Sequence, residues 1–104
     1  MIDNIYDNLP ESKQEVFESL FKNDDVKIER IVSSGNSTPK GEWLEQDKNE
    51  WVIVLSGFGE LLFEGEEQPF KMRPGDYIFI PAGKKHRVER TDDSRNTIWL
   101  SVHF

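Results

Sequence analysis

The sequence predicts an all-β domain, a barrel or sandwich, preceded by one short helix. Three observations predict it. From residue 26 onward, seven or eight short apolar segments alternate with clusters of Gly, Pro, Asn, Asp and Ser, which is typical of closely spaced strands. Before residue 26, the apolar spacing is that of a helix. A chain of 104 residues buries one sizeable core, so we expect a single compact domain.

The helix is predicted over residues 11–22, because four apolar residues there follow an i, i+1, i+4, i+5 pattern that forms one helical face. Pro10 suits the first turn, where a missing N–H costs nothing. Asn23 and the two aspartates after it end the pattern. We therefore divide the chain into an N-terminal arm and helix, residues 1–25, and a barrel domain, residues 26–104. The apolar residues are Val16, Phe17, Leu20 and Phe21.

The strands are predicted from two kinds of pattern. Alternating or β-branched runs favour half-buried strands, and the continuous apolar run of residues 51–55 is typical of a strand covered on both faces. The turns between them contain Gly or Pro, which end strands and reverse the chain. The predicted strands are residues 26–31, 51–55, 60–63, 69–72, 77–80, 86–90 and 97–104.

Charge and composition exclude several classes of function. The chain has 20 acidic and 13 basic residues, a net charge of −7, which repels phosphate backbones and anionic lipids, so we expect no nucleic-acid or membrane partner. The absence of cysteine excludes disulfides, thiolate zinc sites and cysteine nucleophiles. No segment is typical of a signal peptide or a membrane span, so we expect a cytoplasmic protein.

One stretch is specific enough to point to a family. Residues 75–86 fit the pattern G-x5-P-x-G-x2-H. Gly75 permits a tight turn into a strand, and Pro81 ends that strand by removing a ladder donor. Gly83 lets the chain reverse, and His86 begins the returning strand, where its side chain can face the barrel interior.

This stretch resembles the second conserved motif of the cupin superfamily, although Arg90 stands where that motif usually has Asn. The first cupin motif is present only in its second half, Glu50-x6-Gly57. Its two histidine positions fall on Leu44 and Gln46, or on Trp43 and Glu45 in the longer register. The resemblance covers residues 38–104 and implies a double-stranded β-helix, the cupin jelly-roll barrel, with a variant first motif.

In that family, two histidines, a glutamate and the second-motif histidine bind one metal. The resemblance therefore implies a metal site in which Glu50 and His86 match, Gln46 occupies a ligand position, and His103 can complete the set. Such donors suit Fe, Mn, Ni or Zn. Three alternatives stay open: Glu50 and His86 form a buried hydrogen-bonded pair without metal, His103 is a surface or core residue, and Glu45 replaces Gln46.

Three functions follow from the resemblance. The first is a metal-dependent enzyme of the dioxygenase, isomerase or lyase type, for which no general base is identified. The second is a non-catalytic module that binds or senses a sugar or carboxylate without metal. The third is a homodimer paired through edge strands or residues 1–10. Trp43 either stacks on a ligand or belongs to the core. All depend on Glu50 and His86 converging from adjoining strands.

Overall fold

A computed structural model describes all residues from 1 to 104, and it confirms the all-β prediction. Eight strands form, and no part of the chain is helical. No helix capable of crossing a membrane is therefore present. The strands are β1 (Val16–Lys22), β2 (Lys27–Ser33), β3 (Glu50–Ser56), β4 (Gly59–Phe63), β5 (Phe70–Met72), β6 (Tyr77–Ile80), β7 (His86–Thr91) and β8 (Thr97–His103).

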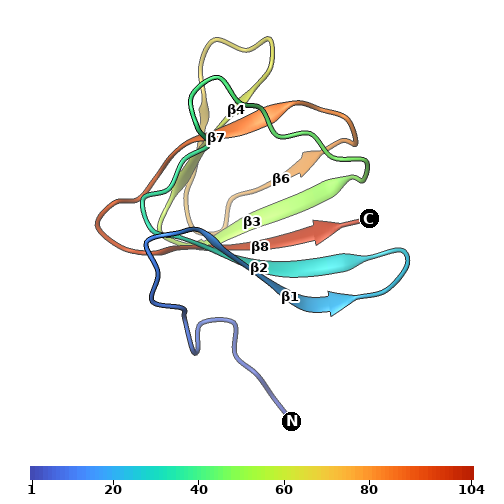
Figure 1. Cartoon of the computed structure of the whole chain (residues 1–104), viewed down its shortest axis with the longest axis vertical. Coiled ribbons are helices and arrows are strands. Elements are labelled where there is room, and N and C mark those ends of the chain that lie inside the picture. Colours follow the sequence, from blue (N-terminus) through green and yellow to red (C-terminus); the bar gives the residue numbers. More distant parts are fainter.

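The strands form two antiparallel sheets that face one another. The larger sheet has the order β1-β2-β8-β3-β6, and the smaller sheet has the order β5-β4-β7. In Figure 1 the strands β1, β2, β8 and β3 lie side by side below β4 and β7. The chain crosses between the sheets from β3 to β4, from β5 to β6, from β6 to β7 and from β7 to β8, so the inner faces of both sheets enclose one interior.

The predicted N-terminal helix is wrong, because residues 16–22 form β1 at the edge of the larger sheet. β1 pairs with β2, and a β-bulge between Ser19 and Phe21 adds one residue to β1. The bulge changes the alternation, so apolar residues occur at spacings that also fit a helix. The two sides of this edge strand are also poorly covered: Phe17, Leu20 and Phe21 are 58%, 51% and 52% exposed. Pairing with β2 therefore overrides the local helical pattern.

The N-terminal arm is held against the larger sheet by the buried Arg30 of β2. Its guanidinium donates hydrogen bonds to the carbonyls of Ile5, Asp7 and Asn8, at 2.7 to 3.2 Å. It also forms an ion pair with Glu18 of β1 at 2.9 Å. One side chain thus ties the arm to the β1–β2 hairpin. The homodimer, predicted to pair through edge strands or through residues 1–10, stays a prediction.

The core lies between the two sheets and is centred on Trp99 of β8. The indole nitrogen of Trp99 donates a hydrogen bond to Ser33 Oγ at 3.1 Å, so its polar atom is satisfied inside the barrel. Its six-membered ring packs directly over Gly59, at the start of β4. The main apolar cluster is Val52, Val54, Leu61, Phe63, Met72, Ile80 and Trp99.

Adding a methyl group at residue 59 should destabilise the barrel. A Cβ there would clash with Trp99 Cη2 and Cζ2, so the indole ring or the backbone of β4 would have to shift. We expect Gly59→Ala to lower the free energy of unfolding by about 1–3 kcal/mol, as measured by urea denaturation. The cost should shrink in a Trp99→Phe background, where the outer ring atoms are absent. Equal costs in both backgrounds would contradict this packing.

Candidate functional site

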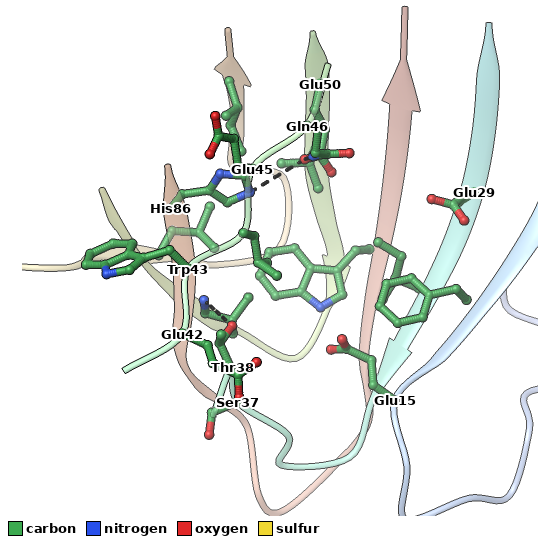
Figure 2. A pocket seen from close by; sticks show the side chains of 18 of the residues that line it. Glu15, Glu29, Ser37, Thr38, Glu42, Trp43, Glu45, Gln46, Glu50 and His86 are labelled. Atoms are coloured by element: carbon green, nitrogen blue, oxygen red, sulfur yellow. Dashed lines mark hydrogen bonds and ion pairs between the residues drawn. The ribbon is translucent and has the colours of Figure 1, made fainter. Parts of the chain in front are cut away.

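A pocket of about 410 Å³ opens between the two sheets, within the range of small-molecule sites. Its walls come from the inner faces of both sheets and from the segment of residues 37–46, which precedes β3. Figure 2 shows that Gln46 and His86 lie close to Glu50, while Glu15 and Glu29 lie on the other side of the pocket. Most of the remaining lining is apolar, including Ile31, Leu61 and Trp99.

Strand register places four polar residues on the inner face of the larger sheet. Residues directly opposite one another in antiparallel strands share a face of the sheet. Glu50 of β3 lies opposite His103 of β8, and Glu29 of β2 lies opposite Ser101 of β8. Since Ser101 and His103 are two residues apart on β8, they also share this face. These side chains therefore form one polar patch in the larger sheet.

His86 reaches the same point from the smaller sheet. At the start of β7 it lies between Phe63 of β4 and Leu44 of the 37–46 segment, with which it forms an isolated bridge. Its Nδ1 lies 2.9 Å from the carbonyl oxygen of Lys84. A carbonyl only accepts, so Nδ1 carries a proton, and Nε2 is the ring nitrogen that faces Glu50. The sequence predicted adjoining strands, whereas the two residues meet from opposite sheets.

The Glu50 carboxylate is the centre of the polar cluster. Its Oε1 accepts a hydrogen bond from Gln46 Nε2 at 2.6 Å, and its Oε2 accepts one from Ser101 Oγ at 2.5 Å. The two histidines flank it, with His86 Nε2 3.8 Å from Oε1 and His103 Nε2 3.8 Å from Oε2. Both carboxylate oxygens are thus occupied by neutral donors, as a buried carboxylate requires.

His103 is held on the side of the patch away from His86. Its Nε2 lies 3.0 Å from Ser101 Oγ and 3.2 Å from Glu29 Oε1. Ser101 donates its single proton to Glu50, so its hydroxyl accepts from His103. The chain Glu29–His103–Ser101–Glu50 therefore links two buried carboxylates through the larger sheet.

The 37–46 segment is fixed over the pocket by Arg87 of β7. The guanidinium donates to the carbonyls of Thr38 and Glu42, each at 3.0 Å, and pairs with Glu89 at 2.7 Å. The carbonyl of Gln46 accepts a hydrogen bond from the amide of Gly83, whose φ is +78°. Gly83 thus makes the turn that the sequence predicted, and its amide anchors Gln46 beside Glu50.

All four predicted site residues, Gln46, Glu50, His86 and His103, lie in this one pocket. Glu45 lies at its exposed mouth, and Trp43 lines its rim, partly exposed, rather than the core. Sequence reasoning missed three contributors to the site: Glu15, Glu29 and Ser101. Ser101 was detectable, because it shares a strand face with Trp99 and His103.

The donors present do not fit a metal centre as they are arranged. No group of three or more His, Cys, Asp or Glu side chains is placed to hold a metal ion. Gln46 turns its amide nitrogen, not its oxygen, to Glu50, and both Glu50 oxygens are engaged by Gln46 and Ser101. His103 faces Ser101 and Glu29. Among the atoms of these candidate metal ligands that lie beside Glu50, only the Nε2 of His86 makes no hydrogen bond. The metal stays a sequence-based prediction, and we derive no step through it.

Comparison with known proteins identifies the family of the chain. A family model described as the cupin domain matches residues 31–103. The chain therefore belongs to the cupin family, as the motif over residues 75–86 predicted. No curated protein matches the sequence.

Solved structures agree with this family. The chain is similar to a protein from Ralstonia eutropha JMP134 described as a “putative mannose-6-phosphate isomerase”, with 39% identity and a TM-score of 0.95, covering 99% of this chain and 96% of that one. An RmlC-like cupin with a double-stranded β-helix fold from Methanocaldococcus jannaschii has 22% identity, a TM-score of 0.73 and coverage of 99% and 91%.

The DMSP lyase DddQ from Ruegeria pomeroyi has 23% identity and a TM-score of 0.72, over 86% of this chain and 46% of that one. At this identity the similarity shows the fold alone. The double-stranded β-helix predicted from the motif is thus the fold that the neighbours share, without the predicted helix.

Removal of the Ser101 hydroxyl should destabilise the protein. Ser101 is fully buried, and its hydrogen bond to the Glu50 carboxylate is of the charged type, which contributes about 1.5–3 kcal/mol. We expect Ser101→Ala to lower the free energy of unfolding by about that amount. Urea denaturation at pH 7 measures it, with Ser19→Ala on exposed β1 as the control. Equal stability of the two variants would contradict the network around Glu50.

Proposed function

We propose that the chain binds a small polar molecule in the barrel pocket directly through its side chains, with Glu50 and His86 as the innermost polar contacts. One observation carries this proposal: His86 Nε2 faces the pocket without a hydrogen bond, 3.8 Å from Glu50 Oε1, although the side chain is only 4% exposed. A ligand that donates to this nitrogen would add a hydrogen bond inside the pocket.

The construction of the pocket supports binding of an organic molecule. Apolar walls with a few convergent polar groups are typical of small-molecule sites. The polar groups are rigid, because Glu50 is held by Gln46 and Ser101, and the His86 ring is held by Lys84. Such preorganisation reduces the entropy that a bound ligand must overcome.

A metal chelator should leave this binding unchanged. We expect at least one ligand from a panel of sugars, small acids and amines to raise the melting temperature in the presence of EDTA. The shift should shrink in Glu50→Gln and His86→Phe, because both remove an acceptor from the pocket floor, and should persist in Glu64→Gln on the exposed β4–β5 turn. A panel in which every stabilising compound requires added metal would contradict the proposal and favour a metal-dependent cupin.

A second candidate is an isomerase that moves a proton without an added oxidant or reductant. The lone pair of His86 Nε2 favours it, since a proton acceptor must face the substrate within hydrogen-bond distance. The 39% identical protein described as a putative isomerase supports the same class. Incorporation of solvent deuterium into a bound sugar, lost in His86→Gln, would identify it. Binding without any exchange would favour the non-catalytic module.

A further inference from the structure

The pocket carries an unusual balance of charge. Five glutamates line it, and no lysine or arginine does. Glu50 and Glu29 are buried, Glu15 is half-buried, and Glu42 and Glu45 lie at the exposed mouth. A ligand therefore meets carboxylates at the entrance and again at the floor. A field of one sign in an enclosed site concentrates ligands of the opposite charge.

The basic side chains nearest to the pocket, Lys27 and Arg87, already form ion pairs or hydrogen bonds with other groups. Lys27 pairs with Glu29 Oε2 at 3.2 Å from outside the pocket lining. Arg87 is engaged by backbone carbonyls and by Glu89. Neither presents a free donor to the interior, so a phosphate or carboxylate ligand would find no charged partner there. The acidic lining therefore disfavours a sugar phosphate in this pocket.

Free hydrogen-bonding groups in the pocket are mainly acceptors. His86 Nε2 faces the pocket without a hydrogen bond, 3.8 Å from Glu50, and the carboxylates only accept. The amide nitrogen of Gln46 already donates a hydrogen bond to Glu50. A ligand that complements these groups must bring donors. An ammonium group brings three donors and a positive charge together.

The apolar walls of the pocket favour an organic cation over a metal ion. Trp99 and Phe17 line the pocket, and aromatic faces attract organic cations within about 6 Å of the ring. The ring of Trp43, at the rim, already lies 6.0 Å from the guanidinium carbon of Arg87. Ile31 and Leu61 add surface that binds hydrocarbon but offers nothing to a hydrated metal. No side-chain group is arranged to hold a metal ion.

We propose that the ligand is a small organic cation, a primary amine with an apolar body, whose ammonium group lies inside the pocket, with Glu50 and His86 on one side and Glu15 and Glu29 on the other. This inference rests on the proposed function, because it names the chemical class of the molecule that occupies the same pocket. It also implies that the sugar phosphate in the description of the Ralstonia protein is not the substrate class here.

The test is calorimetric titration of the full chain with three probes that share a phenyl ring and a short chain: phenethylamine, 2-phenylethanol and 3-phenylpropanoate. Mannose 6-phosphate and manganese chloride are titrated separately. We expect the amine to bind at least about tenfold more tightly than the alcohol, and its affinity to fall with added salt. We expect no binding of the carboxylate or the sugar phosphate.

Variants that replace one glutamate by glutamine test where the ammonium group binds. Glu29→Gln and Glu15→Gln should each weaken phenethylamine binding by about three- to tenfold, as expected for one partly screened charge, while Glu66→Gln in the exposed β4–β5 turn should not. The weak binding of 2-phenylethanol should stay the same in all three. Glu29→Gln loses the contacts of Glu29 with Lys27 and His103, and this loss can impair folding. In that case Glu15→Gln still tests the cation preference.

The outcomes separate this inference from the proposed function. Binding of the alcohol, the carboxylate or the sugar phosphate as tightly as the amine, lost in Glu50→Gln and His86→Phe, would overturn the cation preference and leave the pocket as a ligand site. Manganese binding that requires Glu50 and His86 would overturn both and support a metal centre. No binding of any probe would also contradict both.

Discussion

The arrangement of the site depends on one buried carboxylate. Glu50 lies on the inner face of β3 with no lysine or arginine beside it, and a buried charge without partners costs several kcal/mol. The hydroxyl of Ser101 and the amide of Gln46 offset that cost by donating to its two oxygens. These donors come from β8 and from the segment before β3. The hydrogen bonds that stabilise the Glu50 carboxylate therefore connect the larger sheet to the 37–46 wall of the pocket.

The position of the His86 ring is fixed by a contact of its own. The ring is fixed through Nδ1 by the Lys84 carbonyl in the turn that Gly83 makes, so Nε2 is left to face the interior. His86 Nε2 lies 3.8 Å from Glu50 Oε1, within ion-pair distance but beyond hydrogen-bond distance. Polar groups that are rigid but incompletely paired are typical of sites kept for function rather than for stability.

The cupin barrel and the convergence of residues 50 and 86 could be predicted from sequence because local chemistry encodes them. Pro81 ends β6 at Ile80, and the glycines beside the strands mark their turns. The resemblance over residues 75–86 supplied the barrel architecture that no local pattern contains, although residues 50 and 86 lie in opposite sheets and not on adjoining strands. The helix prediction failed over residues 16–22 because a bulged, half-covered edge strand and a helix share the same apolar spacing.

The acidic lining could not be predicted for a different physical reason. Both faces of β2 mix charged and apolar residues: Glu29 alternates with Ile31 on one face, and Arg30 with Val32 on the other. Alternation alone does not decide which face is inside. That choice is made by the pairing of Arg30 with Glu18 and the N-terminal arm on the outer side, which turns Glu29 inward. Glu15 precedes β1 and reaches the pocket only because β1 is a strand.

The central claim is that Glu50 is held by Ser101 and Gln46, leaving His86 Nε2 for an organic ligand. It is tested most directly by a crystal structure of protein grown with manganese, iron, nickel and zinc, with anomalous maps at each absorption edge. The account predicts both hydrogen bonds to Glu50 intact and no anomalous peak within about 2.5 Å of His86 Nε2, the upper end of protein–metal bond lengths. A metal bonded to both Glu50 and His86 would contradict it.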